Sequence, residues 1–122
     1  MSFIRYLLDE HVDSTLRTQL LRHEPDLVVW IIGDPGAPKR GTLDPDLLLW
    51  CEANDFMLVT NNRKSMPVHL QAHLAAGHHV PGILTLNPHM TLGTTIDQLL
   101  FIRGASEAEE YRDLLLYLPL TD

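Results

Sequence analysis

Four short apolar runs alternate with segments of helical character, and this alternation constrains the fold more than any other feature. The runs cover residues 3–8, 27–32, 56–60 and 83–86. The second run, LVVWII, is apolar at every position, which is typical of a strand covered on both faces. Strands that alternate with helices form parallel sheets with helices on either side. We therefore expect a three-layer αβα domain with a mainly parallel sheet of at least four strands.

Start signals for helices follow each apolar run. Asp44 precedes Pro45, which predicts an Asp cap with proline at the first helical position. Ser65 can cap a further helix, and residues 106–109 (SEAE) form a capping box for a last helix that stops before Pro119. The expected helices span about residues 14–23, 44–54, 65–77, 91–103 and 106–118.

Length and composition are those of one small domain, residues 1–122. No run of 18 apolar residues predicts a membrane span, and no signal-peptide pattern opens the sequence, so we expect a cytoplasmic protein. Cys51 is the only cysteine and is expected in the core. The net charge of −7 argues against a general nucleic-acid coat, which needs Lys and Arg to neutralise phosphates. It leaves open an enzyme that holds phosphates through a bound cation.

Polar residues follow the expected strands, where parallel sheets bind their ligands. The first strand leads into Asp9, Glu10 and His11, and the third into residues 60–65 (TNNRKS). The helix start at residues 44–46 (DPD) can fold over the same rim, after a Gly- and Pro-rich loop at 33–43. Carboxylate, amide and hydroxyl oxygens are the ligands that Mg²⁺ and Mn²⁺ take. The sequence therefore predicts a cation site at this edge.

Three segments carry a resemblance to a known family: residues 7–11 (LLDEH), 41–48 (GTLDPDLL) and 58–67 (LVTNNRKSMP). Their order resembles the DUF5615 group of PIN-like proteins, short bacterial proteins related to the PIN domains of toxin–antitoxin ribonucleases. The resemblance covers about residues 4–101. It implies a three-layer αβα fold and an acidic cluster that binds Mg²⁺ or Mn²⁺ for phosphodiester hydrolysis. RNA, an antitoxin and another protein are the partners that we consider. A homo-oligomer is a further alternative, because the leucines at 114–116 can pack in the core or at a subunit contact.

The resemblance assigns roles to single residues. Asp9 matches the first acid and Asp44 the acid that opens the second helix, with Asp46 able to share its role as catalytic and metal-binding residue. The third acid normally follows the Thr that ends the third strand, and Asn61 and Asn62 stand there instead. An amide brings no charge, so metal binding should be weakened. The expected rim, which would contact substrate, comprises Glu10, Thr60, Asn61, Asn62, Arg63, Lys64 and Ser65.

Each feature also has a structural interpretation. Asp44 is explained as a helix cap, and the segment 60–65 as a turn. His69 and His73 have the spacing of zinc ligands, but without a third ligand they favour a surface cluster with His78 and His79. Three functions therefore remain open: a metal-dependent nuclease, specifically an RNase; a catalytically silent PIN-like module that binds nucleic acid or protein; and a receiver-like phosphoacceptor domain, which the Asn after the third strand disfavours.

Overall fold

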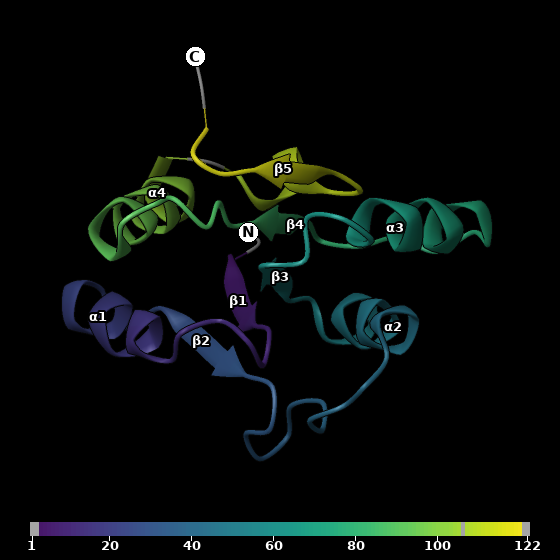
Figure 1. Ribbon diagram of the computed structural model, residues 1–122, viewed down its shortest axis with the longest axis horizontal. Helices are drawn as coiled ribbons and strands as arrows, with labels where there is room; N and C mark the ends of the chain where they lie inside the picture. Colours follow the sequence, from purple (N-terminus) through teal and green to yellow (C-terminus); the bar gives the residue numbers. More distant parts are fainter. Residues whose placement is uncertain (1–2, 106, 121–122) are drawn as a thin grey trace.

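Five strands and four helices make up the domain in the computed structural model, which describes residues 3–105 and 107–120 (Figure 1). The strands are β1 (Arg5–Leu8), β2 (Val28–Ile31), β3 (Met57–Thr60), β4 (Ile83–Thr85) and β5 (Leu115–Tyr117). The helices are α1 (Thr15–His23), α2 (Asp44–Asn54), α3 (Met66–Ala75) and α4 (Leu92–Ala105), with a 3₁₀ turn η1 (Ala108–Tyr111). No helix within the described part of the chain is long and apolar enough to cross a membrane.

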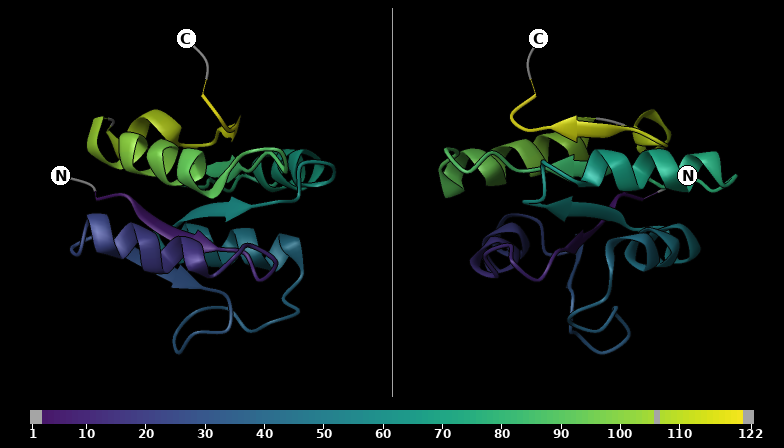
Figure 2. Two further views of the ribbon diagram at one scale, coloured as in Figure 1. Left: turned by 60° about the vertical axis from the view of Figure 1, so that its left-hand side comes forward. Right: turned by 45° about the vertical axis from the view of Figure 1, so that its right-hand side comes forward.

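The strands form one parallel sheet in the order β2-β1-β3-β4-β5. Figures 1 and 2 show α1 and α4 on one face of this sheet and α2 and α3 on the other. The predicted αβα architecture is thereby confirmed. The chain leaves β1 toward β2 on one side and returns to β3 on the other, so the strand order reverses between β1 and β3. Such a switch point opens a crevice at the carboxyl ends of the strands.

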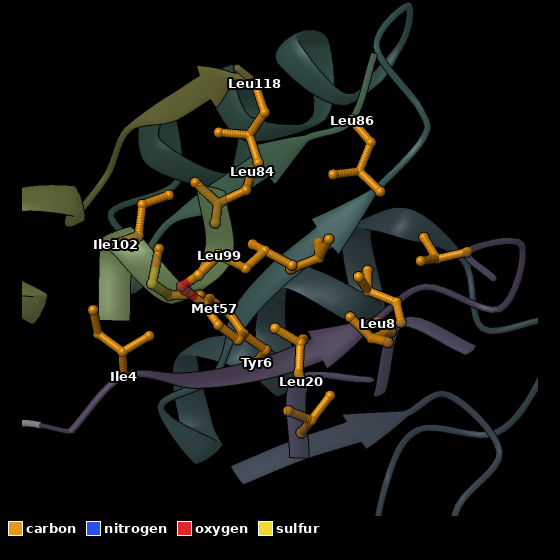
Figure 3. Close-up of a cluster of buried hydrophobic side chains, with 14 of the residues drawn as sticks. Ile4, Tyr6, Leu8, Leu20, Met57, Leu84, Leu86, Leu99, Ile102 and Leu118 are labelled. Carbon is orange, nitrogen blue, oxygen red and sulfur yellow. The ribbon is translucent and has the colours of Figure 1, made fainter. Parts of the chain in front are cut away.

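Alternate side chains of the central strands supply two separate cores. Tyr6 and Leu8 of β1 face α1 and α4, where the Tyr6 hydroxyl donates a 2.7 Å hydrogen bond to the Leu99 carbonyl (Figure 3). Leu7 faces the opposite way, into the cluster beneath α2 and α3 that includes Cys51. Each central strand is buried on both faces, which explains its unbroken apolar sequence. The prediction that Cys51 is a core residue is confirmed, since it is 1% exposed.

The C-terminal segment does not form the expected helix. A capping box is present, between Glu107 and Glu110, but the helix is one 3₁₀ turn, and Asp113 follows with φ +64°. The chain then adds β5 to the sheet, with Leu115 in register with Ile83. Residues 115–117 pair with the open edge of β4, and this tertiary pairing overrides the local helix signal. The predicted cap Ser106 lies outside the described residues.

Two of the predicted caps are also corrected. The N-cap of α2 is Leu43, so that Asp44 is the first residue inside the helix and its side chain makes no capping hydrogen bond. Ser65 does occupy the N-cap of α3, but its hydroxyl caps nothing. The Asp44 side chain therefore does not cap its own helix, and capping does not explain an aspartate at this position.

Candidate functional site

Asp9 lies at the switch point, directly after β1. Its Oδ2 accepts a 2.7 Å hydrogen bond from the hydroxyl of Thr60, the last residue of β3. Its Oδ1 accepts the backbone N–H of Glu10 at 2.8 Å. Thr60 is fully buried and Asp9 half-buried, so the carboxylate is held at the carboxyl edge of the sheet. The parallel register of β1 and β3 brings these two side chains together.

Asn62 continues this network from β3 to α2. Its backbone N–H donates to the Thr60 hydroxyl at 3.1 Å. Its side-chain Oδ1 accepts the backbone N–H of Ser65 at 3.1 Å, in the place of a cap for α3. A backbone N–H only donates, so this bond fixes the amide orientation and turns Nδ2 toward Asp44, whose Oδ2 lies 3.0 Å away. Asn62 therefore acts on Asp44 as a donor.

Asp44 is the second acid of the site, and it faces a histidine that the sequence analysis did not assign to it. His69, on the first turn of α3, places its Nε2 3.6 Å from Asp44 Oδ2. Both side chains are half-buried, at 26% exposed for Asp44 and 32% for His69. Within the described chain, Asp44 Oδ1 accepts no hydrogen bond. The available signal was the position of His69 four residues after Ser65, one turn into a helix that begins at the carboxyl edge.

The two asparagines have different surroundings. Asn61 is exposed, and its Nδ2 donates to the backbone carbonyl of His11 at 3.1 Å, in the β1–α1 loop. Of the two asparagines, only Asn62 is hydrogen-bonded to Asp44. Asp46 is exposed and has no hydrogen bond or ion pair within the described residues, and the same holds for Lys64.

Two further strand-end acids organise the long loop at residues 32–43, which projects beyond the β2 edge of the sheet (Figure 1). Glu10 Oε1 accepts the backbone N–H of Gly41 at 2.9 Å, which ties this loop to the site. Asp34 accepts the backbone N–H of Ile31 at 2.8 Å and pairs with Arg17 at 2.5 Å. Asp34 thus closes the turn after β2, whereas Glu10 joins the loop to the candidate site.

A groove of about 540 Å³ opens beside Asn61, on the side of α1 and α4. Its polar lining comes from His11, Asp13, Asn61, Arg63 and Asn87, and its apolar lining includes Leu16, Met90 and Leu92. The Arg63 guanidinium also stacks over the ring of Tyr117, 5.1 Å from its centroid. Arg63 is the one cationic side chain of the predicted rim that lines this groove.

The remaining histidines of the predicted cluster lie at the other end of α3. His73 is buried and its Nε2 meets the carbonyl of His79 at 2.9 Å, so it is not part of a surface patch. His78 Nδ1 lies 3.0 Å from Glu52 Oε1, and the backbone N–H of His79 donates to Glu52 Oε2 at 2.9 Å. His69 and His73 therefore point to different partners, and the two do not form one pair of ligands.

Cation ligands are only partly assembled at the carboxyl edge. No group of three or more His, Cys, Asp or Glu side chains is placed to hold an ion anywhere in residues 3–105 and 107–120. Asp9 and Asp44 offer carboxylate oxygens, and these suit a divalent ion that keeps several of its waters. Cys51 offers nothing here, because burial and then the charge of Asp9 raise the pKa of its thiol to about 12.

Comparison of the sequence and the structure with known proteins finds no match among protein-family models, curated proteins or solved structures.

Proposed function

We propose that the chain is a PIN-like metal-dependent nuclease, an RNase, with a reduced acidic site. One observation carries the proposal. Hydrogen bonds join Asp9, Thr60, Asn62 and Asp44 in one continuous network across the switch point, the place where an open parallel sheet binds its ligand. Three segments that are distant in the sequence thus meet around two carboxylates.

Each residue has a defined task in this proposal. Asp9 and Asp44, with the exposed Asp46 two residues further along α2, would hold Mg²⁺ or Mn²⁺. When bound, the ion would polarise the phosphodiester and make a bound water more acidic. Thr60 orients Asp9 through its hydroxyl. Arg63, on the groove next to the site, would contact the phosphate backbone of a single strand. With only two fixed carboxylates, cation binding should be weak and turnover slow.

The experiment measures Mn²⁺ binding by calorimetry and cleavage of a fluorescent RNA in parallel. Wild type is compared with Asp9→Asn and with the matched control Asp26→Asn, an exposed acid in the turn before β2 at the opposite edge. We expect Asp9→Asn to lose both Mn²⁺ affinity and cleavage, and Asp26→Asn to keep both. Equal Mn²⁺ affinity in wild type and Asp9→Asn would contradict a cation site at Asp9.

A second candidate function is the silent PIN-like module that binds a protein partner. The observation that favours it is the 3.0 Å bond from Asn62 to Asp44, which gives Oδ2 of this carboxylate a partner without an ion. The net charge of −7 then favours a basic protein over RNA as the partner. Absence of cleavage by wild type, together with unchanged Mn²⁺ affinity in Asp9→Asn, would support it.

The receiver-like alternative has less support. That fold needs a carboxylate at the end of β3 to accept a phosphoryl group, and the residue after Thr60 is Asn61, whose amide is bound to the His11 carbonyl. Stable phosphorylation by a small phosphodonor would be the result that revives it.

A further inference from the structure

We infer that His69 is a ligand of the cation at this edge, and that the site therefore prefers an imidazole-binding ion such as Zn²⁺ to Mg²⁺. The inference rests on the proposed function, in that it takes the carboxyl edge to be a cation site. It concerns the class of ion and a residue that neither the sequence motifs nor the reduced acidic set included.

The separation of the two side chains is the first argument. His69 Nε2 and Asp44 Oδ2 are 3.6 Å apart, which is longer than a charge-assisted hydrogen bond of about 2.7–2.9 Å. Two ligands of one tetrahedral ion, with Zn–N and Zn–O distances of about 2.0–2.2 Å, are separated by roughly 3.4 Å. The observed spacing is thus close to that of a ligand pair, and little movement of either side chain is needed to admit an ion.

The second argument is that Asn62 cannot fill this role. Its Oδ1, the only atom that could ligate a cation, is turned to the backbone N–H of Ser65. Its Nδ2 faces Asp44 and repels a cation. The absent acid is therefore replaced, on the α3 side of the crevice, by an imidazole rather than by the amide that stands in its place in the sequence.

Rigidity of the pair is the third argument. Asp44 is the first residue of α2 and His69 lies in the first turn of α3, and these two helices pack against each other on the same face of the sheet. Both side chains are half-buried, so one face of each remains open to water or to a phosphate oxygen that could complete the coordination. Two protein ligands leave the other positions of a tetrahedral ion to water or a phosphate oxygen, one more open position than a catalytic zinc site with three protein ligands has.

Imidazole selects the ion. Neutral imidazole suits Zn²⁺, Ni²⁺ and Fe²⁺, whereas Mg²⁺ takes oxygen ligands almost exclusively. Loss of His69 should therefore weaken the binding of the first class of ion and leave Mg²⁺ binding unchanged. This difference separates a ligand from a residue that only supports the local structure, which would affect all ions alike.

The test uses wild type, His69→Gln and the matched control His78→Gln, whose imidazole contacts Glu52 at the opposite end of α3. Zn²⁺ and Mg²⁺ are titrated into each by calorimetry. We expect at least about tenfold weaker Zn²⁺ binding in His69→Gln, with Mg²⁺ affinity unchanged and His78→Gln like wild type. Co²⁺ added to wild type should shift and broaden the NMR signals of the His69 ring, a measurement that needs no variant to fold.

Three results would overturn the inference: equal Zn²⁺ affinity in wild type and His69→Gln, loss of Zn²⁺ binding in His78→Gln alone, or Co²⁺ effects confined to other histidines. These results are independent of RNA cleavage. Cleavage that needs Mg²⁺ and Asp9 but not His69 would support the proposed nuclease and show that His69 is not part of its site. Zn²⁺ binding through His69 without cleavage would support His69 as a ligand and contradict the proposed nuclease.

Discussion

Asn62→Asp changes one atom at the centre of the site, and its effect should depend on whether a divalent cation is present. The new carboxylate can keep the hydrogen bond from the Ser65 backbone N–H, so α3 retains its cap. What changes is the group that faces Asp44 Oδ2 at 3.0 Å, where a donor N–H becomes a negatively charged oxygen. Without an ion this substitution should destabilise the fold, and with one it should not.

The magnitude follows from two terms. Two like charges about 4 Å apart repel by about 1 kcal/mol in bulk water and about 4 kcal/mol at the effective dielectric constant near a protein surface. The lost hydrogen bond to a charged group adds about 1.5–3 kcal/mol. Because the Asp44 side chain is 26% exposed, the lower part of the range applies, and we expect a loss of about 3 kcal/mol. A cation present at about 100 times its Kd raises the free energy of unfolding by about 2.7 kcal/mol, which nearly offsets this loss.

Thermal unfolding in EDTA and in saturating Mg²⁺ measures both effects. We expect the Tm of Asn62→Asp to lie roughly 10 °C below that of wild type in EDTA, and to recover most of this difference in Mg²⁺. The control is Asn61→Asp, which adds the same charge at an exposed neighbour whose amide bonds the His11 carbonyl. If Asn61→Asp and Asn62→Asp respond alike to Mg²⁺, the reasoning that places Asn62 at the missing-acid position is refuted.

Three further predictions concern stability. Tyr6→Phe should cost about 1–2 kcal/mol in urea unfolding, because it leaves the buried Leu99 carbonyl without its donor. Gly82→Ala should destabilise the protein by more than that, since φ is +150° and an added Cβ would lie 3.0 Å from a backbone oxygen; an unchanged Tm would contradict this. The backbone N–H of His79 lowers the pKa of Glu52 in the folded state, so the stability that Glu52 contributes is present above about pH 4.5 and is lost as the pH falls through this lower folded pKa. The difference in free energy of unfolding between wild type and Glu52→Gln should therefore vanish at that lower pH.

The sheet was readable from the sequence because its strands are buried on both faces. Runs such as residues 56–60 leave no polar face, and this pattern belongs to a parallel sheet between two helical layers. The C-terminal segment was not readable in the same way. A capping box forms between Glu107 and Glu110, one residue later than the predicted box at residues 106–109. The choice between a helix and β5 depends on the open edge of β4, a partner some thirty residues away that a local pattern does not contain.

The sequence predicts those parts of the candidate site that the topology of the sheet alone determines. The carboxyl ends of β1 and β3 had to meet, which placed Asp9 beside Thr60. The orientation of single side chains was beyond the sequence. Asn61 and Asn62 are adjacent residues of the same type, so the sequence does not distinguish them. Only the hydrogen bond from Ser65 shows which of the two amides faces Asp44. His69 was overlooked because its spacing from His73 suggested a pair on one helix face, whereas the two rings face different carboxylates.

Asn62 also determines how strongly any ion can bind. An arriving cation must compete with the bond from Asn62 Nδ2 for Asp44 Oδ2, and breaking such a bond to a charged group costs about 1.5–3 kcal/mol, or about tenfold to a hundredfold in affinity. Asp44 Oδ1 escapes this cost, because no group in the described chain donates to it. An ion held between His69 Nε2 and Asp44 Oδ2 does meet this cost, because Oδ2 is the oxygen that accepts the bond from Asn62. The Asn62 amide therefore lowers the affinity of the site for any ion bound at Oδ2, and the His69 imidazole determines which class of ion binds best.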